Sequence, residues 1–297
     1  MASSPRALVL TGLGINCEAE TAHALQLAGA APELVHFNQL LKEGGSSLES
    51  FQILVLPGGF SFGDDIQAGR VLANKFKYKL HAPLKKFVES GKPVLGVCNG
   101  FQVLAQLGAL PGWENWERKM TLARNASGRF EERWVRLRSE DCACPFASHT
   151  GILSMPIRHG EGRAAFSSEA DLKKMQEGMQ IVFRYADAEG NAASSYPANP
   201  NGSADSIAGV CNPAGNVLGL MPHPECHVRY TQSPYWTQNP PAVRERGGKG
   251  SKSPVSFFSR LSAALGFSSP ASPVLGPADE GNCQALFRNL AEYAKKF

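Results

Sequence analysis

The residues of this 297-residue sequence that are best placed to do chemistry begin with a cysteine between two glycines. Cys98 directly follows the apolar run Val94–Val97, with Gly96 two positions before it and Gly100 two positions after it. This pattern predicts a buried strand, a sharp turn that carries the thiol, and then a helix, because small residues let the backbone approach itself closely. The positive end of that helix favours the thiolate, which is the reactive form of cysteine. We therefore expect Cys98 to be a nucleophile rather than an inert core cysteine.

A histidine and a carboxylate that could serve this thiol lie far downstream, in Pro222-His223-Pro224-Glu225. A nucleophilic cysteine needs a base within hydrogen-bond reach, and the base needs a third group that holds its ring. The proline between the two residues indicates extended backbone, so Glu225 would reach the imidazole from a turned loop. The predicted catalytic residues are therefore Cys98, His223 and Glu225.

The elements that must position these residues alternate between strands and helices over the first hundred residues. Strands are expected at residues 7–11, 33–37, 51–56 and 94–97, and helices at residues 18–28, 68–78 and 83–89. Such alternation predicts an α/β fold, with a mostly parallel twisted sheet and helices on both of its faces. Active residues in such sheets lie at the carboxyl ends of the strands. Because Gly12, Gly58-Gly59 and Cys98 each follow an expected strand, their three turns should meet at one crevice.

From about residue 121 onward the pattern predicts a small antiparallel addition to this sheet. Further strands are expected at residues 130–137 and 181–185, and a hairpin of residues 206–210 and 217–221 should deliver His223. Residues 157–162 are expected to form a glycine-flanked loop that carries His159 and Glu161. A final amphipathic helix, residues 282–295, should pack back on the body. We expect residues 1–297 to form a single domain.

The composition indicates a globular protein, with 43% hydrophobic and 19% charged residues. No apolar run approaches the roughly 18 residues that span a bilayer, and the first residues indicate a strand rather than a signal peptide. Seven cysteines, an odd number, are spread along the chain, which predicts reduced thiols in a cytoplasmic protein. Cys142-Ala143-Cys144 is too isolated to indicate a metal site, and Pro222 and Pro224 argue against one at His223, Cys226 and His227. We expect neither a membrane partner nor a bound metal.

The excess of positive charge belongs to one segment. Residues 227–278 contain six basic residues and one acidic residue, a balance of +5 in a chain of net charge +4. The rest of the chain therefore carries about −1. Residues 229–277 are rich in Ser, Pro and Gly, which predicts a partly disordered insertion. Binding of nucleic acid is the alternative for such a segment, but its charges lack interleaved aromatic residues, so we expect no nucleic-acid partner.

Four motifs, taken together and in this order, resemble those of the class I, triad-type glutamine amidotransferases. They are Pro57-Gly58-Gly59-Phe60-Ser61-Phe62-Gly63-Asp64, Gly96-Val97-Cys98-Asn99-Gly100-Phe101-Gln102, His159-Gly160-Glu161-Gly162 and Met221-Pro222-His223-Pro224-Glu225. The set is most similar to the glutaminase subunits of phosphoribosylformylglycinamidine synthases, which belong to purine biosynthesis. The resemblance covers about residues 6–225 and the C-terminal helix. Residues 229–277 form a longer segment than this family needs, and residues 112–155 are only loosely similar to it.

The resemblance implies that Cys98 attacks the side-chain amide of glutamine, while His223 transfers the proton and Glu225 holds the imidazole. It implies substrate contacts at Gly59, Phe60, Asn99, Gln102, His159 and Gly160. Backbone N–H groups of Gly59 or Phe60, and of Asn99, would stabilise the oxyanion. A structural loop histidine at His159 and a capping carboxylate at Glu161 remain open alternatives.

The products would be glutamate and ammonia, and the ammonia must be used at another catalytic site. The sequence has no phosphate-cradling Gly-x-x-x-x-Gly-Lys-Ser/Thr loop, and the sheet domain leaves no room for a second catalytic domain. We therefore expect no cofactor in this chain and a partner chain that uses the ammonia. By resemblance, the partner is the large synthetase subunit, which would bind ATP, magnesium and formylglycinamide ribonucleotide. A small accessory subunit is expected beside it.

Two other interpretations remain. The chain could be a class I amidotransferase that serves another acceptor, although the Phe60-Ser61-Phe62-Gly63-Asp64 and His159-Gly160-Glu161-Gly162 variants argue against this. It could also be a non-catalytic, redox-sensing relative with the same sheet. Such a protein would keep the elbow cysteine but would lack a His-Pro-Glu segment placed to complete a triad.

Overall fold

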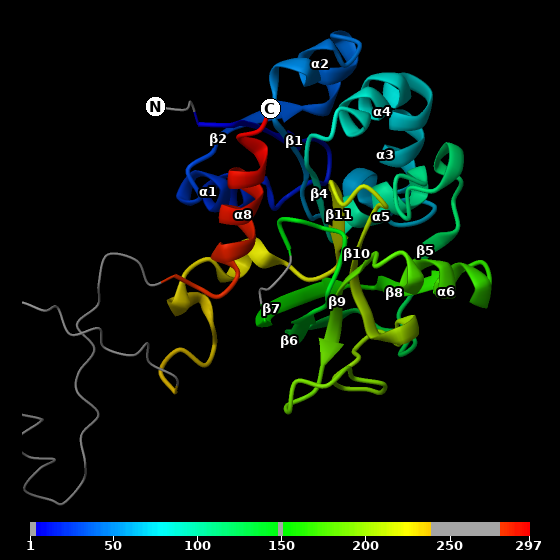
Figure 1. Cartoon of the computed structure of the whole chain (residues 1–297), viewed down its shortest axis with the longest axis vertical. Helices are drawn as coiled ribbons and strands as arrows, with labels where there is room; N and C mark the ends of the chain where they lie inside the picture. Colours follow the sequence, from blue (N-terminus) through cyan, green and yellow to red (C-terminus); the bar gives the residue numbers. More distant parts are fainter. Residues whose placement is uncertain (1–3, 148–150, 239–279) are drawn as a thin grey trace, which may run out of the picture.

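The computed structural model describes residues 4–147, 151–238 and 280–297 (Figure 1). The strands within these ranges are β1 (Arg6–Thr11), β2 (Ala31–His36), β3 (Ile53–Leu56), β4 (Val94–Val97), β5 (Met120–Arg124), β6 (Glu131–Ser139), β7 (Ile152–His159), β8 (Glu161–Phe166), β9 (Ile181–Ala186), β10 (Ile207–Cys211) and β11 (Val217–Leu220). One sheet of nine strands has the order β2-β1-β3-β4-β11-β10-β9-β6-β7, and β5 pairs with β8 separately.

The half of the large sheet from β2 to β11 is parallel. All residues of β3 and β4 are buried, as expected for short apolar strands whose two faces are both covered. The α/β fold predicted from the alternating pattern is confirmed. The sequence also places β1, β3 and β4 within two residues of their observed bounds.

The other half of the sheet, from β11 to β7, is antiparallel. The predicted hairpin is present as β10 and β11, joined by a turn at Pro213–Gly215. The loop predicted at residues 157–162 is wrong in part, because β7 runs to His159 and β8 begins at Glu161. Strand β7 pairs with β6 over eight residue pairs, which is a long-range contact. The Gly and Pro residues near the end of β7 locally favour a loop, so the sequence pattern does not indicate this strand.

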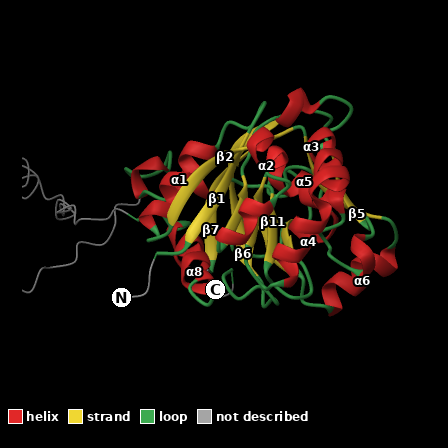
Figure 2. Cartoon of the chain, turned by 90° about the horizontal axis from the view of Figure 1, so that it is seen from above, coloured by secondary structure: helices red, strands yellow, loops and turns green. Residues whose placement is uncertain are grey.

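Helices cover both faces of the large sheet (Figure 2). They are α1 (Glu18–Leu27), α2 (Phe37–Lys42), α3 (Arg70–Lys75), α4 (His81–Glu89), α5 (Asn99–Leu107), α6 (Glu169–Glu177) and α8 (Gln284–Ala294). The two helices expected at residues 68–78 and 83–89 are joined, because a π-helical turn at Phe76–Leu80 connects α3 to α4. Contacts pair α1 with α8 and α3 with α5.

Helix α8 brings the end of the chain back to the body beside α1 (Figure 1). Leu286, Phe287 and Leu290 on one of its faces are buried, which is the arrangement that the amphipathic pattern of residues 282–295 predicts. Most of the insertion predicted at residues 229–277 lies outside the described residues. That prediction and the prediction of a single domain over residues 1–297 therefore stay predictions.

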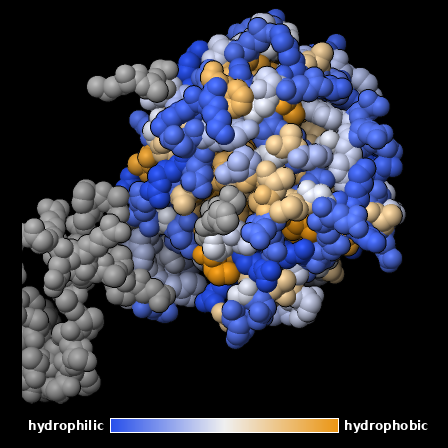
Figure 3. All heavy atoms as spheres, viewed as in Figure 1, coloured by the Kyte–Doolittle hydropathy of each residue, from blue (hydrophilic) through white to orange (hydrophobic). Residues whose placement is uncertain are grey.

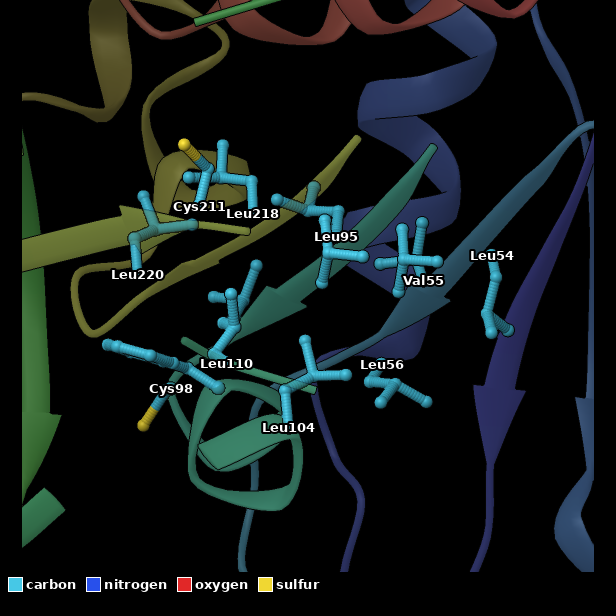
Figure 4. Packing of buried hydrophobic residues seen from close by; sticks show 14 of the residues in the cluster. Leu54, Val55, Leu56, Leu95, Cys98, Leu104, Leu110, Cys211, Leu218 and Leu220 are labelled. Carbon is cyan, nitrogen blue, oxygen red and sulfur yellow. The ribbon is translucent and has the colours of Figure 1, made fainter. Parts of the chain in front are cut away.

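The core fills the space between the parallel strands and α5. Figure 4 shows Val55, Leu95 and Leu218 side by side on the neighbouring strands β3, β4 and β11, and Leu104 of α5 lies beside Gly96, toward the other face of the sheet. The outer surface is mostly hydrophilic on the face seen in Figure 3, with small scattered apolar areas. Within the described ranges, we find no helix that combines the length and the apolar character needed to cross a bilayer. The cytoplasmic compartment stays a prediction.

Candidate active site

Cys98 lies on the strand–turn–helix elbow that its flanking glycines predict. It follows β4 and precedes α5, with backbone angles of φ 50° and ψ −104°, a sparsely populated conformation for a residue with a side chain. A Cβ atom on Gly100 would lie 1.9 Å from the carbonyl oxygen of Leu56, and one on Gly96 would lie 2.6 Å from Leu104 Cδ1. The elbow therefore needs glycine at both positions, and it holds the thiol at the carboxyl end of the central strands.

His223 and Glu225 follow β11, the strand next to β4. The backbone N–H of His223 donates to the carbonyl oxygen of Pro156 at 2.9 Å, which ties the segment to β7. The chain then forms a 3-10 turn at Pro224–His227, and this turn lets the carboxylate of Glu225 reach back to the imidazole. His223 Nδ1 lies 2.7 Å from Glu225 Oε1, and both side chains are buried.

The electrostatic surroundings of His223 favour its charged form. Burial is the largest single influence and lowers its pKa, but the combined interactions with Glu225, Cys98 and Cys17 outweigh it, so the pKa lies well above the usual value. The other ring nitrogen, Nε2, is buried and makes no hydrogen bond to any residue in the described ranges. The Cys98 thiol interacts electrostatically with this ring and lies 3.6 Å from the carbonyl oxygen of Arg158.

A cavity of about 160 Å³ opens beside the Cys98 thiol. It is lined by Gly59, Phe60, Asp64, Cys98, Gln102, Phe130, Arg158, His159, Gly160 and Glu161. Of the six residues predicted to contact substrate, Gly59, Phe60, Gln102, His159 and Gly160 therefore share this cavity with Cys98. Two of the three turns expected at one crevice, those after β3 and β4, line this cavity, whereas Gly12 in the turn after β1 does not. The rest of the lining, apart from Phe130, comes from β7 and the residues that follow it. The roles of the individual residues stay predictions.

Asn99, the sixth predicted contact, is buried below the cavity. Its side-chain oxygen accepts from the Ser61 N–H at 3.3 Å, and its amide nitrogen donates to Asp64 Oδ1 at 3.2 Å and to Gln102 Oε1 at 3.0 Å. Gln102 in turn donates to the carbonyl oxygen of Glu161 at 2.6 Å. These bonds join the loop after β3, the elbow helix and the turn between β7 and β8 into one framework.

The two backbone donors proposed for the oxyanion in the loop after β3 are not equivalent. The Phe60 N–H already donates to the carbonyl oxygen of Gly14 at 2.6 Å. Gly59 has φ 142°, a conformation that residues with a Cβ rarely adopt, and it packs directly against the Gly14–Asn16 backbone. The geometry therefore favours the Gly59 N–H over the Phe60 N–H as the donor from this loop.

The ring of His159 is held by the protein. Nδ1 lies 3.1 Å from Asn125 Oδ1, the ring is buried, and Asn125 also donates to the His159 carbonyl oxygen at 2.8 Å. Burial, and next the charge of His223, lower the His159 pKa to about 3. The imidazole is thus neutral near neutral pH. These contacts favour the structural interpretation of the His159 ring, while its backbone still borders the cavity.

Sequence reasoning did not single out two residues that line the cavity, Phe130 and Arg158. Phe130 directly precedes β6 and belongs to no recognisable motif. Arg158 lies in β7, a strand that the local sequence pattern does not predict. Asp64, the last residue of the motif after β3, also lines the cavity. Burial, with a contribution from the charge of Glu161, raises the Asp64 pKa to about 6.

The trio His223, Cys226 and His227, considered above for metal binding, does not converge within the described part of the chain. His227 Nδ1 lies 2.5 Å from the carbonyl oxygen of Ser154, and its ring meets Trp134 edge-on. A different group, formed by Cys17, His223 and Glu225, does bring its ligand atoms together.

Comparison with known proteins gives consistent matches. The sequence model of the CobB/CobQ-like glutamine amidotransferase domain matches residues 4–258. A protein of Methanococcus maripaludis strain C5 named phosphoribosylformylglycinamidine synthase subunit PurQ is 48% identical over 224 residues, which are 74% of this chain and 82% of that protein. A PurQ subunit of Dehalococcoides mccartyi is 44% identical over 235 residues, or 79% of this chain and 90% of that protein.

Solved structures agree with these matches. A chain in the structure of PurLQS from Thermotoga maritima is 34% identical, with a TM-score of 0.59, and the match covers 77% of this chain and 92% of that one. A glutamine amidotransferase of the same organism is 16% identical, with a TM-score of 0.50, and covers 99% of both chains. The second likeness concerns the fold alone.

The buried, neutral His159 predicts a measurable sensitivity to acid. The unfolded chain protonates this histidine below about pH 6.5, whereas the folded protein resists protonation down to about pH 3. Its contribution to stability is complete above the unfolded pKa and decreases by about 1.4 kcal/mol per pH unit as the pH falls between the two values. Urea unfolding of the wild type and of His159→Gln should show a difference in free energy of unfolding that shrinks at this rate. Parallel curves for the two proteins would contradict the assignment.

Proposed function

This chain belongs to the family of CobB/CobQ-like glutamine amidotransferase domains, and we propose that it is the glutaminase subunit of a phosphoribosylformylglycinamidine synthase. The observation that carries the proposal is the buried His223–Glu225 pair, which lies beside a cysteine on a strained elbow at the edge of a cavity. The names of the relatives support the acceptor, since PurQ subunits match over most of their length.

The proposed reaction begins when Cys98 gives its thiol proton to His223 and its sulfur attacks the side-chain amide carbon of glutamine. The oxyanion that forms accepts hydrogen bonds from the backbone N–H groups of Gly59 and Asn99, each of which would contribute about 3 kcal/mol. His223 protonates the departing ammonia, and a γ-glutamyl thioester remains on Cys98. Water then releases glutamate, with His223 as the base and Glu225 holding the imidazole throughout.

The two earlier alternatives have less support. Glu225 lies 2.7 Å from the imidazole of His223, and both groups are buried, where a charge costs free energy. A non-catalytic relative would have no need for this buried pair. A class I amidotransferase for another acceptor would share the triad, so only the nature of the partner separates it from our proposal. The relatives named PurQ favour the purine acceptor.

The proposed partner is the large synthetase subunit, which would receive the ammonia through an enclosed route and would hold ATP and magnesium. A small accessory subunit completes the proposed complex. We name as the apolar rim the exposed side chains of Leu13, Phe60, Ile66 and Phe130. Phe60 and Phe130 line the cavity and their ring centroids are 6.2 Å apart, and the Phe62 N–H binds the carbonyl oxygen of Leu13. Exposed apolar side chains in and beside the lining of a cavity are typical of a docking surface.

Ile66 supports this location for the partner most strongly. Its side chain is 87% exposed, and its φ of 72° is unfavourable for a β-branched residue. It lies between Asp64, which lines the cavity, and Ala68, whose N–H donates to Glu161 at 3.1 Å. Backbone strain and exposure of an apolar side chain both cost free energy, and burial of the side chain by a partner would offset that cost.

Substitution of the nucleophile tests the proposed reaction. In the complex reconstituted with the synthetase subunit, Cys98→Ala should lower the glutamine-dependent rate by about 10⁴-fold or more, because no thioester can form. Synthesis supplied with ammonia should continue at the wild-type rate. Cys142→Ala, which removes a half-buried thiol outside the cavity, is the matched control and should leave both rates unchanged. Persistence of the glutamine-dependent rate in Cys98→Ala would show the mechanism to be wrong.

Substitution of the apolar rim tests the partner contact. Ile66→Asp should weaken association with the synthetase subunit by about tenfold or more, because the interface would bury an unpaired charge. Leu34→Asp is the control, since Leu34 is 52% exposed on the edge strand β2 and should keep wild-type affinity. Calorimetric titration of each variant with the partner gives both affinities. Equal affinities for the two variants would remove the rim from the interface.

A further inference from the structure

A second thiol reaches the His223–Glu225 pair, and the proposed reaction gives it no role. Cys17 follows β1 at the start of α1, is half-buried, and its Sγ lies 3.9 Å from His223 Nδ1. This is the same ring nitrogen that contacts Glu225. The Cys17 thiol therefore lies next to the hydrogen bond by which Glu225 orients the imidazole, and not next to the nitrogen that would serve Cys98.

The backbone fixes Cys17 in this position. Its N–H donates to the carbonyl oxygen of Gly58 at 3.3 Å, and its own carbonyl oxygen accepts from Thr21 Oγ1 at 2.7 Å. A Cβ atom on Gly58 would lie 2.6 Å from His223 Cε1 and 3.3 Å from Cys17 Sγ. Glycine at this position is thus what allows the thiol and the imidazole to lie so close together.

The three side chains form a set of metal ligands. Cys17 Sγ, a His223 ring nitrogen and a Glu225 carboxylate oxygen all lie within 4.8 Å of one another. Glu225 Oε2 is buried and has no hydrogen-bond partner among the residues that the structure describes, so one oxygen of this carboxylate is unused there. Thiolate, imidazole and carboxylate are the ligands that Zn²⁺ prefers, and its bond lengths place ligand atoms roughly 3.5 Å apart. The separation of 3.9 Å between sulfur and nitrogen is close to that value.

We propose that Cys17, His223 and Glu225 form an inhibitory site for a divalent transition metal of the zinc class. On binding, the Cys17 thiol and His223 Nδ1 each lose a proton to solvent, and the metal forms bonds to the sulfur, the nitrogen and a Glu225 oxygen. The Nδ1 to Oε1 separation of 2.7 Å must then increase, because the metal replaces the shared proton. Water fills the fourth position.

The consequence for catalysis rests on the proposed function. With Nδ1 bound to a metal, Glu225 no longer holds the imidazole, and Nε2 carries the only proton of the ring, so the ring cannot accept the Cys98 thiol proton. The metal would therefore lock the glutaminase in a reversible inactive form. Binding at the Cys98 thiol and His223 Nε2 instead is the competing arrangement, and the two differ in which cysteine they require.

Cobalt binding tests the site without reference to activity. Co²⁺ added to the chain in its complex should produce a thiolate-to-cobalt charge-transfer band in the wild type and in Cys98→Ala. Cys17→Ser should lose the band or weaken cobalt binding at least tenfold. Cys226→Ser is the matched control, because this half-buried thiol follows Glu225 directly yet lies outside the ligand group, and it should keep the band. Absence of the band in the wild type, its loss in Cys98→Ala or its persistence in Cys17→Ser would overturn the proposal.

Zinc titration of the glutamine-dependent rate tests the inhibition. Zn²⁺ should inhibit the wild-type complex reversibly, a chelator should restore the rate, and Cys17→Ser should need at least tenfold more zinc relative to its own metal-free rate. Equal sensitivity of Cys17→Ser and the wild type would refute the inhibitory role. A chain that binds cobalt as described but hydrolyses no glutamine would leave the site standing and would count against the proposed function alone.

Discussion

The hydrogen bond between His223 and Glu225 is the interaction on which the rest of the site depends. Both side chains are buried, and a pair of this kind repays its desolvation only when its geometry is good. Loss of one partner would leave the other uncompensated, at a cost of about 3–5 kcal/mol. Two features of the protein hold the pair in place. The Pro156 carbonyl oxygen accepts a hydrogen bond from the His223 backbone N–H, and Gly58, which has no side chain, leaves room for the imidazole ring.

The sheet brings this pair to the thiol. Strands β4 and β11 are parallel neighbours, with Val97 opposite Leu220, and the Cys98 N–H donates to the Leu220 carbonyl oxygen at 2.8 Å. Because the two strands end in register, Cys98 and His223 leave the sheet at the same edge although 125 positions separate them in the sequence. The hairpin of β10 and β11 thus joins the antiparallel half of the sheet to the site, and the elbow glycines let the thiol turn toward it.

Much of this arrangement could be predicted from the sequence, because its signals are local. The apolar runs of β1, β3 and β4, the glycines around Cys98 and the turn residues between β10 and β11 each determine their own structure. The contacts that join distant segments could not be predicted. Strand β7 forms through pairing with β6, the His159 ring is held by Asn125, and Gln102 bonds to the Glu161 backbone. Nothing in the sequence around Cys17 indicates that it lies close to His223. That contact depends on Gly58, which packs against both side chains.

Labelling with a diazoketone analogue of glutamine tests the central claim most directly, since such an analogue alkylates the thiol that would attack the amide. In the complex, we expect one label per chain, located by peptide mass mapping on Cys98, together with loss of glutamine-dependent activity and protection by glutamine. The Cys98→Ala variant should take up no label. A label on Cys17 or Cys226 in the wild type, or full glutaminase activity after Cys98 has been labelled, would contradict the account.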